Sequence, residues 1–240
     1  MRNGHHVVLL ASIALAGGGC VGDIGDANDV PPVDTVSCEE GPVAGPSPIR
    51  RMTRFEYDQT VRDLLGDTTN PAHGFGAEEE AFGFNNNAAA LITTQALAEQ
   101  YMLAAEDVSL RATEPLSKNV ACDPTAAGEE VCAKQFIDTF GKRAFRRPLT
   151  DAEKSLLFTQ YQFGRAQEDF RLGIRMVIET ALQSPAFLYR VELGIPEETS
   201  GNVMPLTSWE MASRLSYFLW ATMPDDELFA AAEADQLRTP

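Results

Sequence analysis

A Thr-x-x-Glu pattern occurs three times from residue 53 onward, each time directly before a run of apolar residues at helical spacing. The pairs are Thr53 with Glu56, Thr150 with Glu153, and Thr207 with Glu210. In such a capping box each side chain accepts a hydrogen bond from the backbone N–H of the other residue, so the pattern marks the first turn of a helix. No stretch from residue 50 onward shows a convincing alternation of apolar and polar residues, which would indicate a β-strand. The sequence therefore predicts an all-α fold from residue 50 onward.

Apolar spacing and stop signals divide this part of the chain into separate helices. We expect helices over residues 53–65, 94–112, 130–145, 151–164 and 167–183, then two more that begin near Thr207 and Asp225. The clearest apolar stripe lies in the helix at 167–183 and consists of Phe170, Ile174, Val177, Ile178, Ala181 and Leu182. In the helix after Thr207 the residues expected to face inward are Met211, Leu215, Phe218 and Leu219.

These helices are expected to form two or three modules. We predict an N-terminal helical domain over residues 50–115, a second over 130–193, and the start of a third over 204–240, where we expect the chain to be truncated. Hydrophobic residues make up 44% of the chain, which is enough for a buried core.

The first twenty residues, MRNGHHVVLLASIALAGGGC, are organised like an export signal. The apolar run is too short for a bilayer, which needs about 20 residues. The glycines followed by Cys20 resemble a bacterial lipobox, although Gly17 stands where that pattern has an aliphatic residue. The resemblance implies a lipoprotein signal peptide over residues 1–19, a lipid anchor on Cys20, and an exported protein at the outer membrane or facing the periplasm, with the cell surface as an alternative. The alternative is a secretory signal cleaved near Gly19.

The segment that follows this signal has the composition of a linker. Residues 20–49 contain six acidic residues and no Lys or Arg, together with many Gly and Pro. Such a segment cannot bury enough apolar surface to offset the entropy of ordering it. We therefore predict a disordered acidic tether that holds the folded part off the membrane.

Charge and motif content argue against several functions. The formal net charge is −16, so no nucleic-acid partner is expected, because phosphate contacts need clustered Lys and Arg. His5 and His6 lie at the extreme N-terminus and leave His73 alone in the remaining chain, so no metal site is predicted. The sequence contains no GxSxG, HExxH, SxxK or glycine-rich phosphate loop. We assign no catalytic residue, and whether the chain is an enzyme stays open.

Two cysteines flank a short polar loop, CDPTAAGEEVC. We expect a disulfide between Cys122 and Cys132, because an exported protein reaches an oxidising compartment. Closing a loop of this size contributes about 3 kcal/mol through chain entropy. The alternatives are a pairing of Cys38 with one of them or with a part of the protein outside this chain.

The triplet Asn85, Asn86 and Asn87 favours a structured turn, because Asn side chains bond their own backbone and tolerate left-handed conformations. The functional alternative is a polar pocket that contacts a glycan or a neighbouring domain. We keep this triplet as a possible binding turn.

Two further groups have a structural and a functional interpretation. Core packing is favoured over a stacking platform for sugars at the aromatic residues Trp209, Tyr217, Phe218 and Trp220. Complementation of a helix dipole is favoured over an anion site at the cations Lys142, Arg143, Arg146 and Arg147. The acids at 225–227 are interpreted as a helix N-terminus rather than a calcium loop.

Three sets of motifs resemble a family of secreted planctomycete and myxobacterial proteins. They are RMTRFEYDQTVRDLLG with GFNNNA, FGKRAFRRPLTDAE with SPAFLYRVE, and ASRLSYFLWATMPDDEL, in the family's order. That family combines domains of unknown function with a planctomycete-type cytochrome c module. The resemblance implies a c-type haem in a part beyond this chain. No CxxCH motif occurs here, so we expect no covalently bound haem within these residues.

Two hypotheses about function follow. The first is a lipid-anchored, exported cell-envelope protein whose non-catalytic helical region scaffolds a downstream cytochrome c-like redox domain. The alternative is a surface module that binds envelope polysaccharide or a partner through the Asn turn and the aromatic residues. A hydrolase ranks last, because no hydrolase motif is present.

Overall fold

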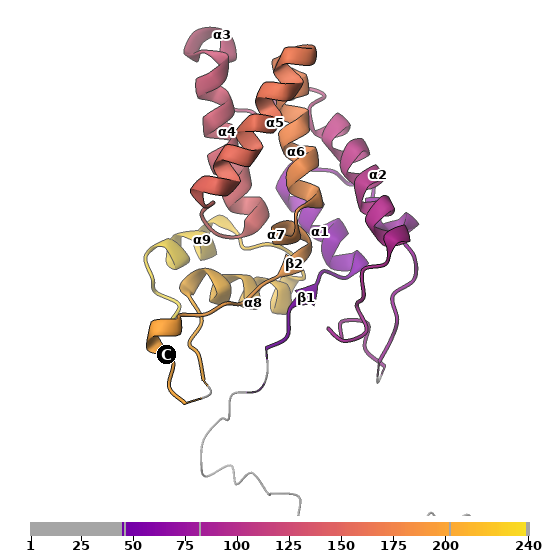
Figure 1. Cartoon of the computed structure of the whole chain (residues 1–240), viewed down its shortest axis with the longest axis vertical. Helices are drawn as coiled ribbons and strands as arrows, with labels where there is room; N and C mark the ends of the chain where they lie inside the picture. The colour runs from indigo at the N-terminus through magenta and orange to yellow at the C-terminus, as the bar shows by residue number, and fades with distance from the viewer. Residues whose placement is uncertain (1–44, 46, 82, 202, 239–240) are drawn as a thin grey trace, which may run out of the picture. The chain divides into compact units, whose positions relative to one another are not determined.

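The all-α fold is confirmed in the part of the chain that the structure describes, residues 45, 47–81, 83–201 and 203–238 of a computed structural model (Figure 1). The predicted signal peptide, Cys20, Cys38 and nearly all of the tether lie outside these residues. The α-helices are α1 (Arg54–Leu65), α2 (Gln95–Ala112), α3 (Pro124–Ala127), α4 (Glu129–Phe145), α5 (Asp151–Gln167), α6 (Phe170–Gln183), α7 (Pro185–Leu188), α8 (Ser208–Trp220) and α9 (Asp226–Glu233). Short 3-10 turns cover Pro71–Gly74, Leu116–Lys118 and Pro196–Glu198.

The capping boxes at the starts of α1, α5 and α8 are confirmed. In α1, for example, the Thr53 backbone N–H donates to Glu56 Oε2 over 2.8 Å, and the Glu56 N–H donates to Thr53 Oγ1 over 3.2 Å. The helix predicted at 167–183 starts later, at Phe170, because Asp169 Oδ1 accepts a hydrogen bond from the Leu172 N–H and caps it there. The start of α6 is therefore determined by its capping side chain and not by the spacing of its apolar residues.

One short element departs from the helical pattern. Residues Arg50–Arg51 (β1) pair antiparallel with Tyr189–Arg190 (β2), and Arg50 lies opposite Arg190. Strands of two residues are too short to show alternating apolar and polar residues, so they could not be predicted from the sequence. Their pairing joins segments that are far apart in the sequence.

Residues 45–240 form one unit with one main core, to which all three predicted helical segments contribute. Helices α4, α5 and α6 lie side by side, and α2 packs against α6 (Figure 1). Helix α1 supplies Tyr57, Val61 and Leu65, and α8 supplies Tyr217. Helix α9 lies beside the end of α4, where Arg143 pairs with Asp226.

The inward face predicted for α8 is wrong at two of its four positions. Phe218 is 83% exposed and Leu219 is 56% exposed. The buried stripe consists instead of Ser208, Ala212 and Ser216, which lie four residues apart on one face. Small side chains allow α8 to approach its neighbours closely, and the larger apolar side chains at its end then face outward.

Helices α5 and α6 meet where glycine leaves room for close backbone approach. A Cβ atom added to Gly164 would lie 2.7 Å from the Leu172 carbonyl oxygen. We expect Gly164→Ala to lower the free energy of unfolding by about 1–3 kcal/mol, because overpacking outweighs the better helix propensity of Ala. Urea unfolding measures this loss. Gly76→Ala is the control, since no atom lies within 4 Å of its added Cβ; equal stability of both variants would contradict the close approach.

Candidate functional site

The β1–β2 pair forms one wall of a cavity of about 650 Å³, which we call the junction cavity. Its walls come from three parts of the chain that are remote in sequence. The side chains that matter for its chemistry are Ser47, Arg50, Asn86, Arg190, Arg214 and Phe218, together with the carboxylates of Glu56 and Glu192. A volume of this size is typical of small-ligand sites.

The first carboxylate at the cavity, that of Glu56, is bound by other groups of the protein. Glu56 Oε1 lies 2.9 Å from Arg190 Nη1 in an ion pair, and Glu56 Oε2 accepts a hydrogen bond from the Thr53 backbone N–H. Both side chains of the ion pair are largely buried. The Arg190 guanidinium also lies 4.8 Å from the centre of the Tyr217 ring, a distance at which cation–π attraction operates.

The second carboxylate, Glu192, is bound by a forked guanidinium. Arg214 Nε donates to Glu192 Oε1 over 2.9 Å, and Arg214 Nη2 and the Ser47 hydroxyl donate to Oε2. Burial alone would raise the pKa of Glu192, but the hydrogen bonds from Arg214 and Ser47 hold that pKa below its ordinary value. Glu192 is therefore ionised at neutral pH and neutralised by Arg214.

The third cation of the cavity has no such partner. The side chain of Arg50 is exposed at the cavity wall and makes no hydrogen bond or ion pair with any residue that the structure describes. Its charge acts on Glu192 only through space and helps to lower the pKa of that carboxyl. Arg50 is therefore the cation most accessible to an added ligand.

The Asn triplet lies beside this cavity. Asn87 Oδ1 accepts from the Ala89 N–H over 2.9 Å, which is the self-bonded turn that Asn favours. Asn85 Nδ2 donates to Glu78 Oε2 over 3.0 Å. Asn86 lines the junction cavity, as well as a shallower hollow on the other side of residues 48–50. Asn87 thus caps a turn over residues 88–90, and Asn86 lines the cavity.

The four aromatic residues of the third segment divide into two groups. Tyr217 is buried, and its hydroxyl lies 3.0 Å from the Thr60 hydroxyl. Trp209 lies 6.2 Å from Phe229 of α9. Phe218 and Trp220 do not join the core, with 83% and 58% of their surface exposed. Core packing, the interpretation favoured from the sequence, is therefore wrong for these last two, and Phe218 lines the junction cavity.

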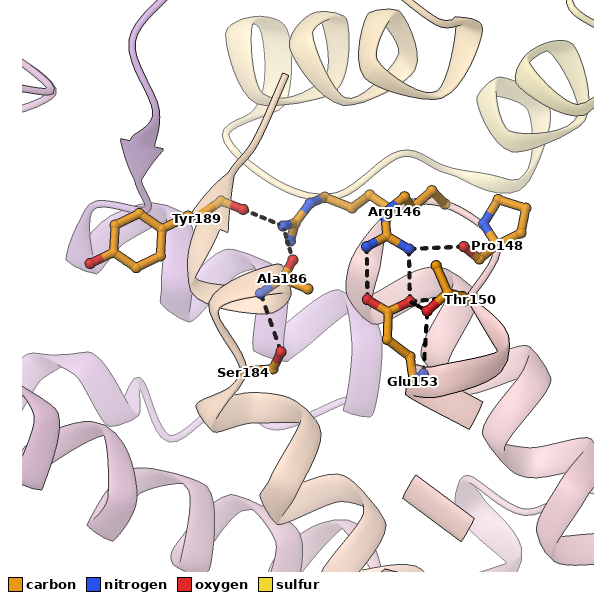
Figure 2. Close-up of polar contacts among 8 residues, drawn as sticks. Arg146, Pro148, Thr150, Glu153, Ser184, Ala186 and Tyr189 are labelled. Atoms are coloured by element: carbon orange, nitrogen blue, oxygen red, sulfur yellow. Dashed lines mark hydrogen bonds and ion pairs between the residues drawn. The ribbon is translucent and has the colours of Figure 1, made fainter. Parts of the chain in front are cut away.

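Arg146 holds the segment that leads into the cavity wall (Figure 2). It ends α4 in the left-handed conformation, with φ of 60°, and its side chain is buried. The Nη1 group donates to the Phe187 carbonyl over 3.1 Å, and Nη2 donates to the carbonyls of Ala186 and Tyr189 over 2.7 and 2.9 Å. These carbonyls belong to α7 and β2. The helix-dipole interpretation of this residue missed that role, which depends on contacts distant in sequence.

The other three cations at the end of α4 pair with carboxylates. Lys142 lies 3.5 Å from Glu233, and Arg143 pairs with Asp226. Arg147 donates to both oxygens of Glu153 over 2.9 and 2.8 Å. Each therefore has a protein acceptor, and none of the three lines the junction cavity.

The Arg147–Glu153 pair predicts an acid-sensitive contribution to stability. Hydrogen bonds from Arg147, then from Thr150, lower the pKa of Glu153 from 4.5 to about 2. Its contribution is fully present above pH 4.5 and is lost as the pH falls toward 2. We expect Glu153→Gln, which keeps the capping box, to reduce the loss of stability between pH 7 and pH 3 by about 1 kcal/mol after solvent screening. Urea unfolding at both pH values measures it; an unchanged pH dependence would contradict the pairing.

A disulfide joins Cys122 and Cys132, with Cα atoms 5.4 Å apart. It ties the turn before α3 to the first turn of α4. Among the described residues, no three His, Cys, Asp or Glu side chains are grouped so that they could hold a metal ion. No helix in this part of the chain has both the length and the apolar content needed to cross a bilayer.

Three regions of the chain match families described only as proteins of unknown function. Residues 50–114 match DUF1587, residues 132–192 match DUF1595, and residues 206–240 match DUF1592. The motifs quoted above lie inside these ranges. No curated protein and no solved structure matches the chain. The junction cavity takes Arg50 and Asn86 from the first range, Arg190 from the second, and Arg214 and Phe218 from the third. The chain is therefore similar, in three successive parts, to three domain families of unknown function.

Proposed function

We propose that this chain is a non-catalytic binding region of an exported, lipid-anchored cell-envelope protein, and that its ligand is an envelope polysaccharide. The observation that supports the proposal is the origin of the junction cavity. Each of the three matched ranges supplies polar or aromatic side chains to its wall. A shared binding site that forms only when the three matched ranges fold together would explain why they occur in one chain.

The chemistry of the wall is that of a binding site. The carboxylates of Glu56 and Glu192 are both held in ion pairs, so neither is available as a general acid or base. The Asn86 amide and the exposed Phe218 ring offer a hydrogen-bonding group and a flat apolar face. Sugars present hydroxyl groups along their edges and C–H groups on their faces, which match these two features.

Retention of the full chain on insoluble polysaccharides tests this proposal. We expect retention on at least one member of a broad panel of envelope and plant polysaccharides, and loss of retention in Phe218→Ser. The control is Phe163→Ser, which changes an exposed ring on α5 that does not line the cavity. Absence of retention on every member, or equal retention of both variants, would argue against a polysaccharide site.

A second function, the scaffolding of a downstream cytochrome c-like redox domain, is favoured by the end of α8. Leu219 and Trp220 are 56% and 58% exposed there and do not line the junction cavity. Exposed apolar side chains in sequence are typical of contact surfaces. The test is the continuation of the reading frame: a CxxCH motif downstream supports this function, and a frame that continues without one removes its main support.

Lipid anchoring has a separate test at Cys20. We expect cells that express the full chain to incorporate labelled palmitate into it, and the Cys20→Ser variant to lose the label. A Cys38→Ser variant is the matched control and should keep it. Label that persists after Cys20→Ser would overturn the anchor and favour an ordinary secretory signal.

A further inference from the structure

We propose that the ligand of the junction cavity is a saccharide that carries an anionic group, and that Arg50 binds this group; the ligand class rests on the binding function proposed above. The side chains that line the cavity carry more positive than negative charge. Three guanidinium groups and two carboxylates line it, although the chain as a whole carries a net charge of −16. This local excess of positive charge needs an explanation.

The two carboxylates are already occupied by protein donors. Glu56 is held by Arg190 and by the Thr53 N–H. Glu192 is held by Arg214 and by the Ser47 hydroxyl. Neither carboxylate can turn to neutralise a further cation without breaking its ion pair, which is largely buried for Glu56. The charge of Arg50 therefore remains available to a ligand.

The arginines retain donors that no described residue uses. A guanidinium carries five N–H donors in a fixed fork. Among the described residues, Arg190 forms an ion pair with Glu56 through Nη1, and Arg214 donates through Nε and Nη2. Arg50 uses none. A planar carboxylate or a sulfate ester can accept two such N–H groups at once, a geometry that Arg binds better than Lys does.

The remaining wall favours a sugar ring as the carrier of the anion. The Asn86 amide both donates and accepts hydrogen bonds, as sugar hydroxyls do. Phe218 exposes 83% of its surface beside the arginines, so a ring could pack on it while its acidic group reaches Arg50.

Calorimetric titration of the full chain tests the inference with four probes of matched size. They are trigalacturonate, its methyl ester, a sulfated galactose trisaccharide and triglutamate. We expect binding of trigalacturonate or the sulfated sugar, and the tighter of the two identifies the anionic group. Arg50→Gln should weaken this binding about 10- to 100-fold, the range for a lost charge-assisted hydrogen bond, and Arg50→Lys should restore part of it.

The matched control is Arg171→Gln, which removes the same charge from the exposed face of α6, outside the cavity. It should leave the affinity unchanged, and a circular dichroism spectrum like that of the parent chain confirms that both variants fold. Equal affinity for trigalacturonate and its methyl ester would overturn the anionic ligand and leave the polysaccharide site in place. Binding of triglutamate alone would overturn the saccharide. Absence of binding by every probe, together with no retention on any polysaccharide, would overturn both proposals.

Discussion

Arg146→Met is expected to lower the free energy of unfolding by about 3–5 kcal/mol, because it leaves one buried and two half-buried acceptors without this donor. The guanidinium donates to the carbonyls of Ala186, Phe187 and Tyr189. A methionine side chain is similar in volume to that of Arg146 but lacks its N–H donors. Each buried carbonyl that loses its partner costs about 1–3 kcal/mol, so the losses accumulate at this one position. Chemical unfolding followed by circular dichroism measures the change.

The control for this variant is Arg171→Met, the same substitution on an exposed part of α6. We expect it to change stability by no more than about 0.5 kcal/mol. Arg146→Lys should be intermediate, since one ammonium cannot reach all the carbonyls that the guanidinium fork reaches. A loss below about 1 kcal/mol for Arg146→Met would show that these carbonyls are satisfied in another way.

Phe187→Ala is expected to be comparably damaging, at about 3–5 kcal/mol. Phe187 is fully buried in the short helix α7 and lies edge-on to Tyr57 of α1, with ring centres 5.7 Å apart. Its removal would leave a void between the first and second segments. Thermal unfolding measures the loss, and a reduced contact between α1 and α7 should appear as faster hydrogen exchange in both helices.

Phe218→Ala provides the comparison, because it deletes the same side chain at a position that is 83% exposed. We expect its stability to stay within about 0.5 kcal/mol of the parent chain, while ligand retention falls. If Phe218→Ala were as destabilising as Phe187→Ala, the exposed orientation of α8 would be wrong and the core packing favoured from the sequence would be right.

The helices could be predicted because their signals are local. Thr53 and Glu56 lie in one turn, so their hydrogen bonds form wherever the rest of the chain goes. The apolar stripe of α6 was equally clear, and all six residues assigned to it are buried. The disulfide was also accessible to sequence reasoning, because its two cysteines are close along the chain.

The orientation of α8 and the roles of the buried arginines could not be predicted in the same way. Phe218 looks like a core residue until the small residues Ala212 and Ser216 are known to face the neighbours. Arg146 resembles any cation at a helix end, and its acceptors lie about 40 residues later.

The junction cavity depends on the same long-range contacts. Its wall forms when β1 pairs with β2 and when Arg214 of α8 binds Glu192. No spacing within one segment encodes this arrangement, and periodicity describes only one element at a time. The Asn triplet and the aromatic residues were recognised as unusual, but their meeting at one cavity required the fold.

Chemical-shift mapping of the isotope-labelled chain with a soluble oligosaccharide of the retained polysaccharide tests the central claim most directly, namely that three segments build one binding site. The cavity predicts the largest shifts at Arg50 and Asn86 of the first segment, Arg190 and Glu192 of the second, and Phe218 of the third. These residues should titrate with a single dissociation constant. Shifts confined to one segment, or located away from the cavity, would contradict the claim.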